Sequence, residues 1–355
     1  MRFFIQTIRR PFRCRTLVVA MTVLLAACGE NGNDFVPVAT APVPGPTVAS
    51  AIPATAIAPV LAGAVWTPRD NARNWQACAS SADGNKLVAV SVNESAQFRG
   101  QIYTSSDAGA NWTARDSHRV WSSVASSADG VKLVATVTGA SLGQIYTSSD
   151  SGLTWVARAS NRLWTSVASS ADGIKLIAVD FVGFIYTSAD SGETWTERAA
   201  DRKRWWVSVA SSSDGSKLLA AETGGRLYTS LDSGVSWKAR DSNLHWQSVA
   251  SSSDGSKLVA VQTRGKIKTS VDGGEHWTEQ NSDGGQFWTA VASSSDGSRL
   301  VAGASSGQIY TSIDSGVTWT ARSSTFNWRC FASSSDGKRL MAGLRDGQLY
   351  TSVGD

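Results

Sequence analysis

Residues 145–155 read IYTSSDSGLTW, in which an aspartate precedes a glycine by two residues and a tryptophan by five. The pattern returns along the chain, and we call each copy an aspartate turn. Its aspartates are Asp107, Asp150, Asp190, Asp232, Asp272 and Asp314. A carboxylate present in every copy cannot be the single acid of one active site. It can accept backbone N–H bonds across a turn, so the pattern predicts a structural role.

A second series of tryptophans gives the chain its period. These residues are Trp75, Trp121, Trp164, Trp206, Trp246, Trp288 and Trp328, spaced by 46, 43, 42, 40, 42 and 40 residues. An Asp-Gly pair follows each of them after a short apolar run, and Asp-Gly between such runs predicts a hairpin. A period near 42 residues is typical of four-stranded propeller blades. The sequence therefore predicts an all-β protein with antiparallel four-stranded units.

The two ends of the repeat region complement each other. Residues 347–355, GQLYTSVGD, supply a third strand and only the start of an aspartate turn. Residues 63–70, GAVWTPRD, contain the missing glycine, tryptophan and fourth strand. We therefore expect a seven-bladed ring over residues 63–355, in which the N-terminal strand completes the last blade and protects its edge.

The phrase S-x-D-x-G-x-T-W resembles the Asp-box, or BNR, repeat. SSDSGLTW, SADSGETW and SIDSGVTW match it fully, whereas Asn111 and His276 depart from it at the threonine. The chain thus resembles the sialidase-like propeller superfamily, and within it bacterial relatives of the photosystem II stability/assembly factor family. Hydrolases and non-enzymes share this fold, so the resemblance does not determine the activity.

The N-terminal 27 residues have the composition of a secretory signal. Five arginines and no acidic residue lie in the first 15 residues. A short apolar run follows and ends at Cys28. Leu25-Ala26-Ala27-Cys28 resembles a bacterial lipobox, which implies cleavage before Cys28 and lipid on its sulfur; the alternative is a plain signal peptide. Gly29 then favours the outer membrane. Residues 28–62, rich in proline and alanine, are expected to form a tether.

Charge and cysteine content exclude several function classes. The chain carries a net charge of +4, but without the five leader arginines 28 basic residues face 29 acidic ones. A near-neutral body does not favour nucleic-acid binding. The cysteines have no metal-ligand spacing, so we expect no metal and no cofactor. Cys78 is the third residue after Trp75, and Cys330 is the second residue after Trp328. Their side chains should therefore point to opposite faces of a strand, which favours two free thiols over a disulfide.

A ligand is expected on the face that carries the variable loops, opposite the aspartate turns, because loops on a rigid frame carry function. The loop DRKRWW, residues 201–206, sets three cations beside two tryptophans and suits an anionic ligand; the alternative is a solvated loop with one buried tryptophan. The candidate binding residues are Arg202, Lys203, Arg204, Trp205, His118, Arg119, Phe181, His245 and Phe287. Further residues that break the repeat are Arg99, Arg162, Arg264 and Arg345.

The residues favour a binding protein over an enzyme. A sialidase needs an arginine triad, a Tyr–Glu pair and an acid, and the chain lacks the Arg-Ile-Pro phrase that accompanies them. Asp180 and Glu222 lie on adjacent blades and on the variable face, and form a pair of carboxylates that a glycosidase could use. We expect a monomeric, lipid-anchored binding or assembly propeller with a protein or glycan ligand. The alternatives are a glycan-active hydrolase or a purely structural envelope protein.

Overall fold

The computed structural model describes residues 61–355, except 93–99, 117, 140–142, 200, 281–284 and 324. The predicted signal peptide, Cys28, most of the predicted tether and Arg99 lie outside the described residues. The described residues form strands and no helix, and none of them forms a helix able to cross a membrane.

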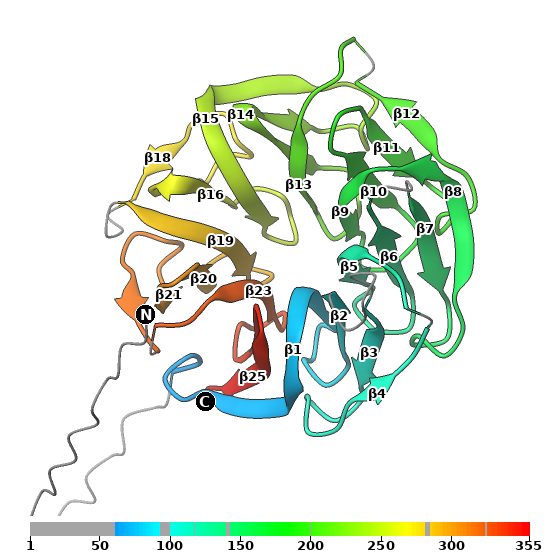
Figure 1. Cartoon of the computed structure of the whole chain (residues 1–355). Helices are drawn as coiled ribbons and strands as arrows, with labels where there is room; N and C mark the ends of the chain where they lie inside the picture. Colours follow the sequence, from blue (N-terminus) through cyan, green and yellow to red (C-terminus); the bar gives the residue numbers. More distant parts are fainter. Residues whose placement is uncertain are drawn as a thin grey trace, which may run out of the picture. The chain divides into compact units, whose positions relative to one another are not determined.

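The strands follow the four-strand repeat, and we call each four-stranded antiparallel unit a blade (Figure 1). The first three blades contain β1 (Thr67–Ser80), β2 (Leu87–Val92), β3 (Ile102–Ser105), β4 (Thr113–Ala114); β5 (Trp121–Ser126), β6 (Leu133–Val137), β7 (Gly143–Ser148), β8 (Val156–Arg162); and β9 (Trp164–Ser169), β10 (Leu176–Asp180), β11 (Ile185–Ser188), β12 (Thr196–Arg198). The fourth and fifth blades contain β13 (Trp206–Ser211), β14 (Leu218–Ser230), β15 (Lys238–Ser251), β16 (Leu258–Gly265), β17 (Ile267–Ser270) and β18 (Thr278–Glu279). The remaining strands are β19 (Gln286–Ser293), β20 (Leu300–Ala304), β21 (Ile309–Ser312), β22 (Thr320–Ala321); and β23 (Trp328–Ser333), β24 (Arg339–Leu344), β25 (Gly347–Val353).

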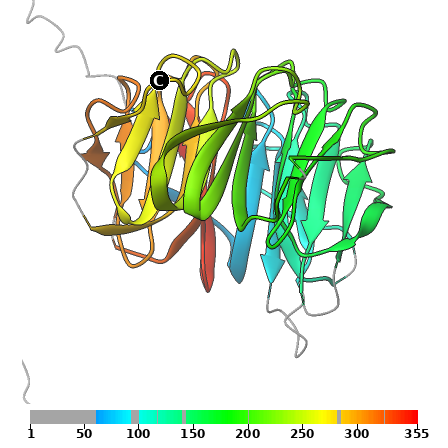
Figure 2. The ribbon, with the colours of Figure 1, turned by 90° about the horizontal axis from the view of Figure 1, so that it is seen from above.

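The blades stand side by side around a central axis, and each begins with its innermost strand (Figures 1 and 2). Long strands carry the chain from one blade to the next. β15 pairs with β14 through its first half and with β16 through its second half. The register shifts directly after the repeated tryptophan, as between Trp246 and Ser248, so each inner strand bulges where it enters its blade.

The hydrophobic core lies between neighbouring blades. Trp121, which is fully buried, packs against Val88 and Ile102 of the first blade and Leu133 of its own. Tyr146 meets the Trp121 ring edge-on at 5.5 Å. β10 is buried along its whole length, as its unbroken apolar run predicts. The packing repeats from blade to blade, so each blade is stabilised mainly by its two neighbours.

The aspartate turn of the second blade illustrates the local chemistry. Thr154 donates its backbone N–H and its hydroxyl to the Asp150 carboxylate at 2.9 and 2.6 Å. These hydrogen bonds lower the pKa of Asp150 to about 2. Gly152 has a φ of 84°, and a Cβ there would lie 2.9 Å from Cγ2 of Thr104 in the preceding blade. The turn is thus held internally and packs closely on its neighbour.

The two ends of the fold meet in one sheet. β1 pairs with β25 through residues 67–73 and with β2 through residues 74–80. The Gly63 N–H donates to Ser352 Oγ at 2.8 Å, and Arg69 Nε donates to Thr351 Oγ1 at 2.9 Å. β1 therefore belongs to the last blade and to the first.

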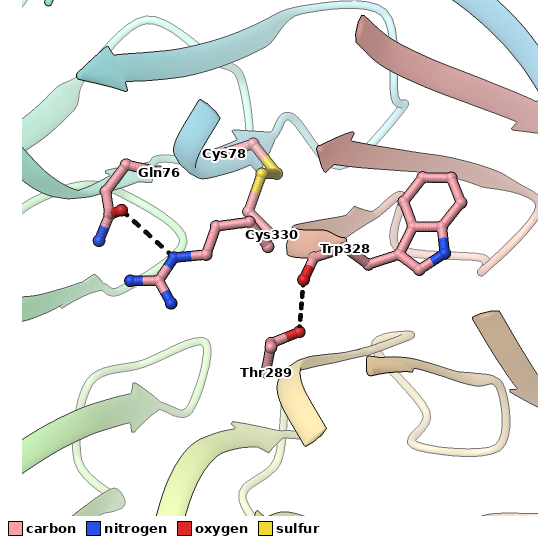
Figure 3. Close-up of a disulfide and its surroundings, with 6 residues drawn as sticks. Gln76, Cys78, Thr289, Trp328 and Cys330 are labelled. Carbon is pink, nitrogen blue, oxygen red and sulfur yellow. Dashed lines mark hydrogen bonds between the residues drawn. A yellow bond between two sulfur atoms is a disulfide. The ribbon is translucent and has the colours of Figure 1, made fainter. Parts of the chain in front are cut away.

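Cys78 and Cys330 form a disulfide across this junction, with Cα atoms 5.8 Å apart (Figure 3). The expectation of two free thiols was wrong. The two residues do lie on opposite faces of their own strands. Because these strands belong to neighbouring blades, the Cys330 side chain points toward the first blade and the Cys78 side chain points back toward the last, and the two sulfurs meet. Elsewhere a serine at the Cys330 position accepts the N–H of the residue at the Cys78 position, as Ser123 does from Val167. The disulfide replaces this contact between blades.

Candidate functional site

The loop 201–206 and the loop after β10 lie together on the face opposite the aspartate turns. Gly183 and Arg204 exchange two backbone hydrogen bonds, of 3.2 and 3.0 Å. The Thr223 N–H donates to the Trp205 carbonyl at 2.9 Å, which fixes the second loop on its own blade. These bonds place the third and fourth blades' variable loops beside each other.

Five exposed side chains at this junction form what we call the aromatic–cationic patch: Phe181, Val182, Arg202, Lys203 and Trp205. Trp205 is 57% exposed, while the next residue, Trp206, is fully buried. An indole held in solvent by fixed backbone, beside two cations, can stack on a ligand and attract negative charge.

Arg204 lies behind this patch and is buried. Its guanidinium donates to both oxygens of Asp201 at 2.7 and 2.6 Å and to the Tyr228 hydroxyl at 3.2 Å. It also stacks on Tyr228, 4.9 Å from the ring centre. The bonds to Asp201 raise the Arg204 pKa further above its ordinary value. The sequence places Arg204 among the candidate ligand-binding residues. In the structure its guanidinium N–H groups are instead bound to Asp201 and Tyr228.

The same arginine position recurs two residues before the inner tryptophan. Arg73, Arg119 and Arg162 stack on the tyrosines of their blades at 4.3, 4.4 and 4.5 Å. Arg119, also proposed from the sequence to bind a ligand, thus repeats a packing arrangement. The sequence signal for this packing is the motif R-x-W, which recurs in consecutive units.

The fifth blade preserves this arrangement with exchanged residues. Leu244 replaces the arginine, and Lys268 replaces the tyrosine. Lys268 lies 5.8 Å from the centre of the Trp246 ring and binds Asp241 at 2.8 Å. A cation above the tryptophan, paired with an acid of the preceding loop, is therefore part of the frame.

Asp180 and Glu222 occupy equivalent places, opposite Trp164 and Trp206 in the second strands of adjacent blades. Asp180 accepts the Phe184 N–H at 3.0 Å, and burial raises its pKa. Glu222 accepts the Tyr228 hydroxyl at 3.1 Å and lies 3.5 Å from Arg202.

Loop backbone covers both carboxylates. A Cβ on Gly183 would overlap the Asp180 carboxylate, and a Cβ on Gly225 would overlap that of Glu222. Asp180 also lies 4.0 Å from Arg162 of the second blade. Each acid is thus held by its own set of contacts beneath a loop.

The other candidates are spread over the same face. His245 is exposed and pairs with Thr223, which in turn binds the Trp205 carbonyl, so His245 borders the aromatic–cationic patch. Phe287 is partly exposed and lies under Arg264, 4.7 Å from its guanidinium. His118 is exposed on the second blade.

The axial strands contain one polar group that the sequence analysis missed. Arg329 donates to Gln76 of the first blade at 3.2 Å, and burial lowers its pKa. Within the described residues, no group of His, Cys, Asp or Glu side chains is arranged to hold a metal ion.

Comparisons of the structure identify the class of fold as a β-propeller. The chain is similar to YCF48 from Cyanidioschyzon merolae, with a TM-score of 0.63 and 17% identity over 82% of this chain and 99% of that one. It is also similar to a YCF48 bound to D1 peptide, with a TM-score of 0.61 and 16% identity over 82% and 97% of the two chains.

A third similar structure is the GH74 xyloglucanase from Xanthomonas campestris. Its TM-score is 0.63 at 15% identity, over 81% of this chain and 53% of that one. No protein-family model and no curated protein matches the sequence. At these identities the similarity establishes the propeller fold, while function has to be argued from the site.

Proposed function

We propose that this protein is a non-catalytic propeller that binds an acidic segment of a protein partner through the aromatic–cationic patch. The observation that carries the proposal is Trp205, which is exposed beside Arg202 and Lys203 and whose carbonyl accepts the Thr223 N–H. The preceding residue, Arg204, is held to Gly183 of the neighbouring loop by two main-chain hydrogen bonds. A preformed aromatic anchor loses little conformational entropy on binding. Arg202 and Lys203 supply the charge that attracts an acidic partner.

A protein partner is favoured over a glycan by one structural similarity. A YCF48 of similar structure is bound to a peptide, D1. The partner of the present chain follows from its own residues, which select an anionic segment able to stack on Trp205.

We infer a seven-bladed ring, because each of seven repeated tryptophans starts or lies in an inner strand. The pairing of β1 with β25 supports a last blade shared between the termini. Because β1 and β25 pair with each other, neither leaves that strand edge open to a second copy of the chain. We therefore expect a monomer.

We also propose that the protein is exported and anchored by lipid on Cys28, with outer-membrane residence favoured by Gly29. The Cys78–Cys330 disulfide supports export, because disulfides persist in oxidising compartments. Mass spectrometry of the mature N-terminus tests the anchor. A diacylglyceryl cysteine at position 28 is expected, and an unmodified N-terminus elsewhere would exclude it.

The second candidate function is a glycan hydrolase. It is favoured by the similarity to a xyloglucanase and by the raised pKa of Asp180, which would suit a general acid. The covering of Asp180 and Glu222 by loop backbone argues against it.

The test of the function uses the purified full chain on an array of acidic peptides, matched neutral peptides and envelope glycans. We expect retention on acidic peptides that weakens with salt, and a loss of about tenfold or more when Trp205 or both Arg202 and Lys203 become alanine. Lys238→Ala, which removes an exposed cation on another part of the fourth blade, should change nothing. Release of sugar from the glycans would favour the hydrolase and contradict the proposal.

A further inference from the structure

A groove of about 320 Å³ lies between the first and second blades, at the end of the molecule that carries the aspartate turns. Lys86 and Arg115 bring two positive charges to it. Leu87, Leu133 and Leu153 give it aliphatic walls. Most of the other lining residues are polar, among them Thr104, Asn111 and Thr113. A concave site that combines apolar walls with placed polar groups can hold a small molecule.

Arg115 is held so that one side of its guanidinium remains available. Its Nε donates to Thr104 Oγ1 at 2.7 Å. Among the described residues, its two terminal nitrogens have no hydrogen-bond or ion-pair partner. Thr104 thus fixes the orientation of a guanidinium whose other edge lines the groove.

The junction of the fourth and fifth blades shows what this guanidinium edge binds. Arg240 occupies the same place and donates Nε to Thr229 Oγ1 at 2.8 Å. Its two terminal nitrogens grip both oxygens of Glu275 at 2.6 Å each. Glu275 follows the glycine of its aspartate turn, and in the second blade this position is Leu153. The same arginine therefore binds a carboxylate in one groove and faces an exposed leucine in the other.

The aspartates beside the groove do not prevent an anion from entering. Asp107 and Asp150 line it, but their oxygens accept hydrogen bonds from their own turns. The equivalent Asp232 and Asp272 flank the junction where Arg240 holds Glu275. An environment with the same two acids thus accommodates a carboxylate on this arginine.

Lys86 adds to the positive charge. Its ammonium makes one long contact, of 3.4 Å, with Ser151 Oγ. Lys217, its counterpart between the fourth and fifth blades, donates to the Asp254 carbonyl at 2.8 Å. Lys217 is the exception, since Lys132 and Lys175 contact serines at 3.2 and 3.3 Å as Lys86 does.

We propose that the groove between the first and second blades binds a small monocarboxylate with an aliphatic chain. The carboxylate binds the free edge of Arg115, as Glu275 binds Arg240, and the chain packs against Leu87, Leu133 and Leu153. The aliphatic walls favour this class over a sugar, because no aromatic ring among the described residues lines the groove. The next two grooves are smaller, about 210 and 160 Å³.

The test titrates the full chain with hexanoate, and with acetate and hexanol as matched probes, by NMR or calorimetry. We expect hexanoate to bind more tightly than either probe, since acetate lacks the chain and hexanol the charge. No hexanoate binding, or hexanol binding as tight as hexanoate, would overturn the proposal.

Two variants follow designs that the chain itself contains. Arg115→Gln keeps the bond to Thr104, as Gln280 binds Thr269 Oγ1 at 2.6 Å, but removes the guanidinium edge. Leu153→Glu supplies an internal carboxylate, as Glu275 does. Each should weaken hexanoate binding by about tenfold or more. Both should remain folded, and wild-type affinity in both would show that the groove is not the site.

The reverse change gives an independent reading. Glu275→Leu frees the terminal nitrogens of Arg240 and should create a second hexanoate site. A stoichiometry that rises from one to two supports the role of the guanidinium edge. An unchanged stoichiometry in a folded variant would contradict it.

Discussion

The Cys78–Cys330 disulfide should contribute much of the stability of this fold. It closes a loop of 252 residues, for which chain entropy alone gives about 5 kcal/mol of stabilisation at 25 °C. The double variant Cys78→Val and Cys330→Ser restores the pair that other blades use, in which Ser208 Oγ accepts the Val249 N–H at 3.1 Å. That hydrogen bond returns about 1 kcal/mol. We therefore expect a net loss of about 4 kcal/mol.

Urea unfolding of the oxidised chain, the reduced chain and the double variant measures this loss. The reduced chain and the double variant should both unfold at clearly lower urea than the oxidised chain. The matched control is Ser208→Ala, which removes only the hydrogen bond and should cost about 1 kcal/mol. If the double variant unfolds at the same urea concentration as the oxidised chain, the disulfide does not stabilise the closure and the reasoning fails.

Other changes test single parts of the frame. Asp150→Ala should lower the free energy of unfolding by about 1–2 kcal/mol without weakening partner binding, checked by denaturation and a binding assay. The folded pKa of Asp150 is about 2, below its unfolded value. Its contribution to the free energy of unfolding should therefore be complete above pH 4 and disappear as the pH falls toward 2. Acid titration of wild type against Asp150→Ala measures this loss. Arg204→Ala should lower stability by about 2 kcal/mol, whereas Arg202→Ala should leave melting unchanged; equal effects would contradict their assigned roles. Gly152→Ala should cost about 1–3 kcal/mol, because a Cβ is strained at this φ and meets the preceding blade.

The sequence predicted the fold well because its physical causes recur in every unit. The Asp-Gly hairpins, the unbroken apolar second strands and the repeated tryptophans all indicate four-stranded blades packed face to face. The complementary ends of the chain predict the pairing of β1 with β25 that the structure contains. Local rules are reliable here because each blade contacts mainly its neighbours.

The sequence was less informative where side chains of different blades meet. Alternation within a strand suggested that Cys78 and Cys330 diverge, yet facing strands turn that divergence into contact. Loop composition groups Arg204 with Arg202, but in the fold Arg204 is buried on Tyr228 and Arg202 is exposed. The Gly183–Arg204 bridge under the patch recurs in other blades, as between Gly100 and Arg119 and between Gly307 and Phe326. The exposure of Trp205 beside Arg202 and Lys203 does not recur, and only the fold shows it.

Binding of a protein partner by the aromatic–cationic patch is tested most directly by a photocrosslinking amino acid at Trp205 in cells, with Leu231 on the opposite face as the matched control. Leu231 is 61% exposed, so both positions can reach a bound protein. We expect one discrete protein adduct from position 205, none from 231, and loss of the adduct when Arg202 and Lys203 become alanine. Equal adducts from both positions, or an adduct unaffected by the loss of the two cations, would contradict it.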